Sequence, residues 1–108
     1  MKLVRLGYSA VEPNVHIRPH WGPSNAQLKA HLGVVVPTAE DGSFCTTLRV
    51  GAEERGWVEG QALLFDDSFL QEARNNCSRR RLVLQAVFSH PGLPAATMEQ
   101  VAPGKPEL

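Results

Sequence analysis

Residues 27–36 read QLKAHLGVVV and are followed by Pro37. In the first half of this run polar and apolar residues alternate, which is the pattern of a strand with two unlike faces. A second run, residues 81–88, reads RLVLQAVF and carries apolar side chains on both alternating faces. Such a strand belongs in a sheet that packs on a second sheet or closes into a barrel. These two stretches therefore predict an all-β fold.

The rest of the chain contains further short β-type runs separated by turn residues. We expect these additional strands at residues 3–8, 15–18, 44–50, 61–65 and 69–73. Asp41-Gly42 is a hairpin signal ahead of the 44–50 run. Residues 74–78 should form a loop, and one or two helical turns are expected near 95–101. Six or seven short strands at this spacing predict a β-sandwich or jelly roll.

Composition limits the partners of the chain, which has 108 residues with 11 Lys and Arg against 11 Asp and Glu. This balance argues against nucleic acid or an anionic membrane as the main partner. No apolar run approaches the length of a transmembrane helix, and the first residues lack the apolar segment of a secretion signal. Cys45 and Cys77 lack metal-site spacing, so we expect them to be reduced in a soluble, cytoplasmic protein.

The histidines are the first candidates for a metal site, and they stand at His16, His20, His31 and His90. In an extended chain His16 and His20 lie about 13 Å apart, too far to share one metal ion. Pro19 stands between them and argues against the helix that would bring them together. His31 lies on the polar face of its strand and could contact a metal or a ligand. A structural hydrogen bond is the simpler explanation for any one of these histidines.

Arg81 opens the 81–88 strand on its inward face. A guanidinium at such a position is suited to hold a carboxylate by two parallel hydrogen bonds. The alternative is a solvated charge within the triplet Arg79-Arg80-Arg81. The residues alone thus predict a small β-sandwich that could bind a ligand.

Four motifs stand in an order that is more specific than any one of them. They are PHWGPSN (19–25), QLKAHLGVVVP (27–37), WVEGQALLFDDSFLQEA (57–73) and RRRLVLQAVFSHP (79–91). Together they resemble the catalytic domain of the aspartyl/asparaginyl β-hydroxylases, which are iron(II)- and 2-oxoglutarate-dependent dioxygenases on a double-stranded β-helix, a cupin-like jelly roll. The resemblance implies a domain of this kind over residues 1–93, followed by a tail over 94–108. The family domain usually carries further N-terminal elements, so we expect a truncated or minimal version.

The resemblance implies that His20 is an iron ligand. Most related dioxygenases place a carboxylate two positions later, whereas this family has a glycine there, as at Gly22. The family's second iron ligand is a histidine in the segment F-D-D-S-F-x-H-E, and Gln71 occupies that position. An amide oxygen is a poorer ligand for iron(II) than an imidazole. Nearby acidic residues are expected to serve the turn or to face solvent: Asp66, Asp67 and Glu72.

The positions that the family uses for its co-substrate are better kept. Ser9 and Arg81 match the serine and arginine that hold the distal carboxylate of 2-oxoglutarate. His31 matches a histidine that contacts the co-substrate near the metal. Lys29 stands where an arginine is common, so the charge is kept and the bidentate fork is lost. His90 also matches a family position and is expected to be structural.

Two functions follow from this resemblance. The first is an enzyme that hydroxylates peptidyl Asp or Asn, or a related substrate, with iron held by His20 and with conversion of 2-oxoglutarate to succinate and CO₂. The second is a non-catalytic relative that keeps the 2-oxoglutarate pocket but lacks a competent iron site, because Gln71 replaces the second histidine. The expected partners are 2-oxoglutarate and a protein or peptide substrate.

Overall fold

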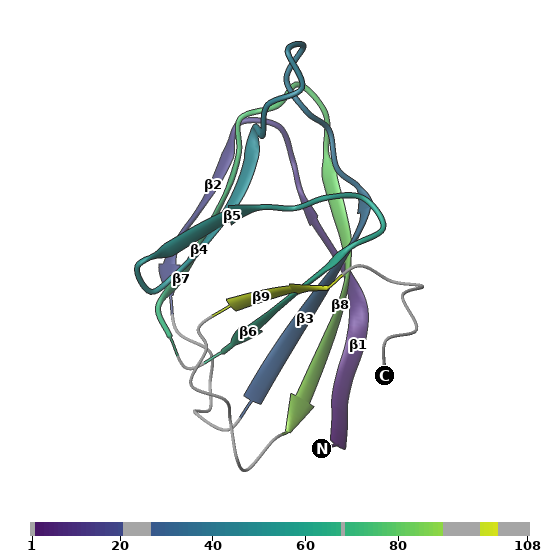
Figure 1. Ribbon diagram of the computed structural model, residues 1–108, viewed down its shortest axis with the longest axis vertical. Helices are drawn as coiled ribbons and strands as arrows, with labels where there is room; N and C mark the ends of the chain where they lie inside the picture. The colour runs from purple at the N-terminus through teal and green to yellow at the C-terminus, as the bar shows by residue number, and fades with distance from the viewer. Residues whose placement is uncertain (1, 21–26, 68, 90–97, 102–108) are drawn as a thin grey trace.

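The computed structural model describes residues 2–20, 27–67, 69–89 and 98–101, and these residues form two antiparallel sheets and no helix. One sheet has the strand order β1-β8-β3-β6-β9 and the other has the order β2-β7-β4-β5 (Figure 1). The strands are β1 (Lys2–Val11), β2 (Val15–His20), β3 (Gln27–Val35), β4 (Thr46–Val50), β5 (Glu53–Gly56), β6 (Ala62–Asp66), β7 (Gln71–Asn75), β8 (Arg81–Ser89) and β9 (Met98–Val101). The predicted all-β class is confirmed.

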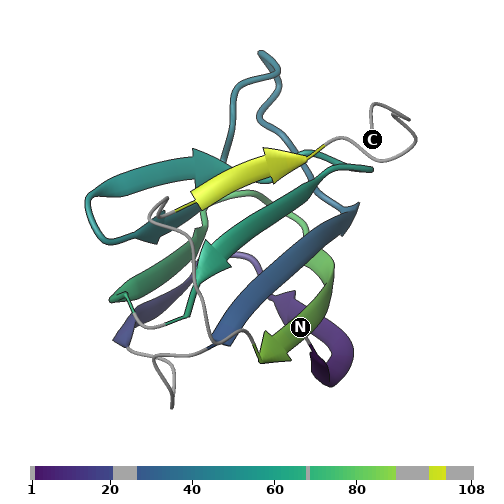
Figure 2. The ribbon, with the colours of Figure 1, turned by 60° about the horizontal axis from the view of Figure 1, so that its bottom comes forward.

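The chain passes repeatedly between the two sheets. Strands β1, β3, β6 and β8 lie in the larger sheet, whereas β2, β4, β5 and β7 lie in the smaller one. Figure 2 shows the strands of the larger sheet side by side, with β1 at one edge. Crossing from sheet to sheet in this way produces the jelly roll that the resemblance implied.

The two longest inner strands turn polar residues toward the interior of the sandwich. In β3 the buried positions are Lys29, His31 and Gly33, and in β8 they include Arg81 and Val83. The apolar residues between them are only half-buried and lie on the other face of the sheet. The main apolar core lies beside this polar region and consists of Val36, Leu48, Val50, Trp57, Leu63, Phe65, Ala73 and Val83.

Two local expectations were wrong, and one strand was not predicted. A loop was expected from residue 74, but strand β7 continues to Asn75. The buried Asn75 side chain holds this end of the strand in place, since it donates to the carbonyl oxygens of Val11 (2.8 Å) and Arg79 (2.9 Å). Residues 98–101, expected to be helical, form β9 and pair with β6. Strand β5 was not predicted, because its sequence EERG is almost entirely polar.

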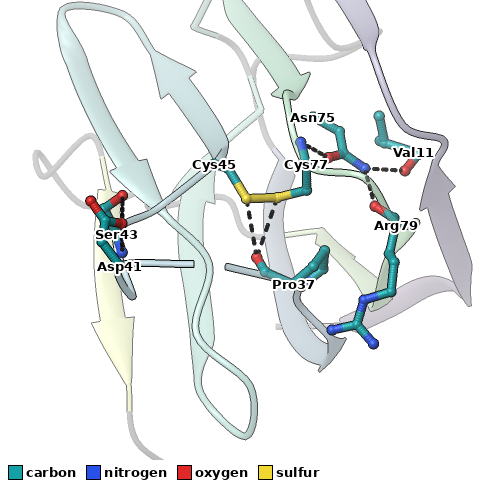
Figure 3. Close-up of a disulfide and its surroundings, with 8 residues drawn as sticks. All are labelled: Val11, Pro37, Asp41, Ser43, Cys45, Asn75, Cys77 and Arg79. Atoms are coloured by element: carbon teal, nitrogen blue, oxygen red, sulfur yellow. Dashed lines mark hydrogen bonds between the residues drawn. A yellow bond between two sulfur atoms is a disulfide. The ribbon is translucent and has the colours of Figure 1, made fainter. Parts of the chain in front are cut away.

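The two cysteines form a disulfide between Cys45 and Cys77, with Cα atoms 5.3 Å apart (Figure 3). The expectation of reduced cysteines is therefore wrong, and disulfides are typical of oxidising environments. The bond joins the segment before β4 to the segment after β7. Its two sulfur atoms lie 3.6 and 3.4 Å from the Pro37 carbonyl oxygen, which we interpret as packing contacts because disulfide sulfurs carry no hydrogen.

No helix in the described part of the chain is long and apolar enough to cross a membrane. Gly22 and His90, which were both named in the sequence predictions, lie outside the described residues.

Replacing both cysteines with alanine should lower the free energy of unfolding by about 3–4 kcal/mol, because the cross-link closes a long loop in the unfolded chain. The two cysteines are 32 positions apart. Urea unfolding of the oxidised parent, the parent in a reducing agent and the double variant measures this effect. The reduced parent should match the double variant, and equal stability of all three samples would contradict the assignment.

Candidate functional site

A cavity of about 170 Å³ lies between the two sheets. It is lined by residues from both sheets, including every residue that the sequence singled out for the site. These residues are Ser9, His20, Lys29, His31, Gln71 and Arg81. The structure therefore brings together side chains that are separated by as many as 72 positions in sequence.

Arg81 is the charged group at the base of this site. Arg81 is only 1% exposed. Even so, no carboxylate of the described residues lies within salt-bridge distance of its guanidinium. One terminal nitrogen donates to the Ser9 carbonyl oxygen (3.0 Å) and hydroxyl (3.1 Å), and the guanidinium carbon lies 4.3 Å from the Trp57 ring centre. Burial lowers the pKa of Arg81 to about 10, so the group stays charged at neutral pH.

The Arg81 Nε–H is buried and has no hydrogen-bond partner among the described residues. A buried donor of this kind is costly unless a ligand or water accepts from it. A cation with an open donor beside a hydroxyl fits a carboxylate, which accepts several charge-assisted hydrogen bonds. Arg81 and Ser9 therefore form a fitting site for one carboxylate group.

His31 is held neutral next to this cation. Burial lowers its pKa to about 3, with a further contribution from the Arg81 charge and, more weakly, from Lys29, while the Gln85 hydrogen bond opposes the shift. Its Nε2–H donates to Gln85 Oε1 (2.9 Å), and its Nδ1 accepts from the Trp57 indole N–H (3.3 Å). Both ring nitrogens thus have protein partners, and their tautomer is set by these contacts.

Lys29, Asp67 and Gln71 form a buried polar cluster, in which Asp67 Oδ2 has no hydrogen-bond partner among the described residues. The Lys29 ammonium lies 2.9 Å from Asp67 Oδ1, which also accepts from the Gln71 amide nitrogen at 2.7 Å. The Gln71 amide oxygen in turn lies 3.5 Å from the Lys29 ammonium. Asp67 lies in the turn after β6, as one of the two expected alternatives had it, but it is fully buried and does not face solvent.

His20 and Gln71 are cross-strand neighbours in the β2–β7 pair. The His20 side chain is exposed, and its Nδ1–H donates to the Arg18 carbonyl oxygen at 3.1 Å. His16 instead forms a hydrogen bond with Glu72, and Arg74 contacts the same carboxylate at 3.2 Å. Both partners lower the pKa of Glu72, and the hydrogen bond from His16 has the larger effect. His16 is not one of the described residues that line the cavity.

The residues at this site do not fit a metal ion held by two histidines. His20 supplies one imidazole, but the Gln71 amide has its nitrogen on Asp67 and its oxygen beside the Lys29 ammonium. In the described part of the chain, no group of three or more His, Cys, Asp or Glu side chains could hold a metal. The donor set therefore suits a carboxylate better than a transition metal.

Three residues that the sequence did not assign to the site hold its polar side chains in place. Asp67 anchors the Lys29 ammonium, while Trp57 and Gln85 fix His31. His31 and Gln85 are direct partners across β3 and β8, although 54 positions separate them. The acidic doublet Asp66-Asp67 was a visible signal. The Gln85 contact depends on strand register, and Trp57 reaches His31 from the segment between β5 and β6, so the sequence pattern gives neither contact.

Comparisons with known proteins identify similar sequences. The sequence profile of the aspartyl/asparaginyl beta-hydroxylase family matches residues 1–91. The mouse aspartyl/asparaginyl beta-hydroxylase is 39% identical over 89 residues, which are 82% of this chain and 11% of that protein. An ornithine lipid ester-linked acyl 2-hydroxylase from Rhizobium tropici is 39% identical over 84 residues, which are 78% of this chain and 29% of that protein. This chain therefore spans less than a third of the length of either relative.

The buried neutral state of His31 predicts a loss of stability in mild acid. The unfolded chain binds a proton at His31 below pH 6.5, whereas the folded protein does so only near pH 3. Stability that is fully present above pH 6.5 is therefore lost as the pH falls toward 3. Between pH 7 and pH 5 the free energy of unfolding should decrease by about 2 kcal/mol from this group.

Chemical denaturation at both pH values measures this change. The variant His31→Gln serves as the control, because it cannot titrate but keeps a hydrogen-bonding side chain. The parent should lose about 2 kcal/mol more than the variant. Equal losses would show that His31 is not held neutral in the folded protein.

Proposed function

Because this chain belongs to the aspartyl/asparaginyl β-hydroxylase family, we propose that its cavity binds 2-oxoglutarate, with Arg81 and Ser9 at the distal carboxylate. The observation that carries this proposal is the buried Arg81 guanidinium, which lacks a carboxylate partner among the described residues and keeps an open Nε–H. A carboxylate supplies both the missing charge and the missing acceptor. The Ser9 hydroxyl lies 3.1 Å from the same guanidinium and can donate to this ligand.

The other cavity residues support a short ligand with an aliphatic stem. Ile17, Leu48 and Ala73 line the cavity from the smaller sheet, while Lys29 and neutral His31 lie on the larger sheet. Lys29 adds a second positive charge toward the proximal end of the ligand, although Asp67 partly neutralises it. The cavity is smaller than the usual range for drug-sized ligands, which is consistent with a compact metabolite.

We further propose that the domain is a non-catalytic relative that keeps this pocket and lacks a competent iron site. Gln71 stands where the family resemblance implies a histidine ligand, and both ends of its amide are engaged by Asp67 and Lys29. The amide oxygen faces the Lys29 ammonium at 3.5 Å, and this positive charge opposes a metal cation at the same place. Among the described residues near the cavity, His20 remains the single imidazole available for coordination.

Hydroxylation of peptidyl Asp or Asn is the second candidate function. It is favoured by His20, which lines the cavity beside position 71. The names of the relatives describe hydroxylases that act on aspartyl and asparaginyl residues and on a lipid acyl chain. In this function Arg81 and Ser9 orient 2-oxoglutarate by its distal carboxylate, and the Trp57 ring packs against the Arg81 guanidinium at 4.3 Å.

Replacing Arg81 with methionine should weaken 2-oxoglutarate binding at least about tenfold, because a charge-assisted hydrogen bond contributes about 1.5–3 kcal/mol. Isothermal titration calorimetry in a metal chelator measures this effect, and thermal unfolding confirms that each variant is folded. Arg80→Met is the matched control, since Arg80 is exposed and pairs with Glu12. Absence of binding by the parent, or equal affinity of parent and Arg81→Met, would overturn the proposed function.

The two candidate functions differ in their response to Gln71→His. If the missing ligand alone prevents catalysis, this variant should gain both iron content and succinate release relative to the parent. Iron content is measured on the purified protein, and succinate is measured with Fe(II), 2-oxoglutarate and ascorbate present. Succinate release by the parent itself, at a rate that Gln71→His does not raise, would refute the non-catalytic assignment.

A further inference from the structure

Gln85 lines the cavity, and half of its side-chain amide is not used by the protein. The residue lies on β8, directly across from His31 on β3, and is half-buried. Its amide oxygen lies 2.9 Å from His31 Nε2. No hydrogen bond between described residues engages its amide nitrogen, so the two N–H groups of this nitrogen are available to a ligand in the cavity.

The orientation of the Gln85 amide is determined by its neighbours. The indole N–H of Trp57 can only donate, so His31 Nδ1, which lies 3.3 Å away, must accept. An accepting Nδ1 leaves the ring proton of His31 on Nε2, where it donates to the Gln85 oxygen. Since the oxygen of the amide faces His31, the amide nitrogen and its donors point away from the histidine.

Gln85 stands between the two cations of the cavity. On the inward face of β8, Arg81 lies four residues before Gln85. Lys29 on β3 is the register partner of Val87, two residues after Gln85. Both cations are close enough to His31, the partner of Gln85, to lower its pKa. A ligand that extends from Arg81 to Lys29 therefore passes the Gln85 amide.

A free amide N–H at this place selects an acceptor on the ligand. It gains a hydrogen bond from a carbonyl oxygen and gains none from a methylene group. In 2-oxoglutarate the carbon next to the proximal carboxylate carries such an oxygen. His31 and Gln71 cannot donate to it, because the ring nitrogens of His31 and the amide nitrogen of Gln71 already have protein partners.

We propose that Gln85 is a specificity-determining residue of this pocket, whose amide N–H donates to the 2-oxo oxygen of the ligand. This proposal rests on the proposed function, because Arg81 and Ser9 must hold the distal carboxylate for the 2-oxo group to reach Gln85. The pocket then distinguishes dicarboxylates that carry an acceptor beside the proximal carboxylate from those that lack one. This discrimination requires no metal ion.

Isothermal titration calorimetry in a metal chelator, with 2-oxoglutarate and 2-methyleneglutarate as ligands, tests this proposal. The second ligand has the same two carboxylates and the same planar carbon, but a CH₂ group replaces the oxo oxygen. The parent protein should bind 2-oxoglutarate about fivefold more tightly than 2-methyleneglutarate, which is the effect expected of one neutral hydrogen bond.

Two variants of Gln85 should lose this preference. Gln85→Met has no donor, so it should bind both ligands with about equal affinity. Gln85→Glu keeps an oxygen for the His31 Nε2–H but presents a second oxygen in place of the amide nitrogen. It should also lose the preference, while its charge weakens the binding of both ligands. Thermal unfolding verifies that each variant is folded.

Gln27→Met is the matched control. Gln27 is half-buried on β3 and is not one of the described residues that line the cavity. This variant should therefore keep the preference of the parent for 2-oxoglutarate.

Three results would overturn the proposal and leave the proposed function intact. They are equal affinity of the parent for the two ligands, a preference that persists in both Gln85 variants, and an equal loss of the preference in Gln27→Met. Absence of binding of both ligands by the parent would instead overturn the proposed function, and this proposal with it.

Discussion

A guanidinium buried without a counter-charge among the described residues is the constraint on which the arrangement of the cavity depends. Removing a charge from water is unfavourable unless dipoles, an aromatic face or an opposite charge replace the lost hydration. Around Arg81 this replacement comes from the oxygens of Ser9 and from the ring of Trp57. The charge also acts on its neighbours, because it is one reason that His31 stays neutral. An anionic ligand at this place would complete the set of contacts.

The second polar group of the cavity is a buried ion pair joined by an amide, although Asp67 Oδ2 has no hydrogen-bond partner among the described residues. Asp67 and Lys29 neutralise each other, and Gln71 contributes one donor and one acceptor to the same pair. A neutral histidine at position 71 would offer its two ring nitrogens at different places, so it could not reproduce both contacts of the amide. Glutamine is therefore integrated into the packing of this site, which supports our proposal that the chain no longer depends on a metal there. Arg81 has a buried Nε–H without a partner among the described residues, whereas the Gln71 amide nitrogen is bonded to Asp67. The two polar groups of the cavity therefore differ in their capacity to bind a ligand.

Local patterns in the sequence predicted the class of fold, but they could not predict which face of each strand points into the interior of the protein. Alternation in residues 27–36 indicated a strand with a polar face, and a polar face usually points to solvent. Here that face points inward, so that Lys29 and His31 reach a cavity. The resemblance to a known family supplied the candidate residues, whereas their contacts depend on register, such as the pairing of His31 with Gln85. The Cys45–Cys77 bond was missed for the same reason, since a separation of 32 residues does not determine a distance.

Strand β1 connects the edge of the larger sheet to the cavity. From Lys2 to Tyr8 every residue of β1 is exposed, whereas Ser9 is half-buried and Val11 is buried against the sandwich. The change occurs where β1 reaches Arg81, because Val11 is the register partner of Arg81 on β8. The buried end of β1 therefore holds Ser9 against the guanidinium, which its carbonyl and hydroxyl oxygens contact at 3.0 and 3.1 Å.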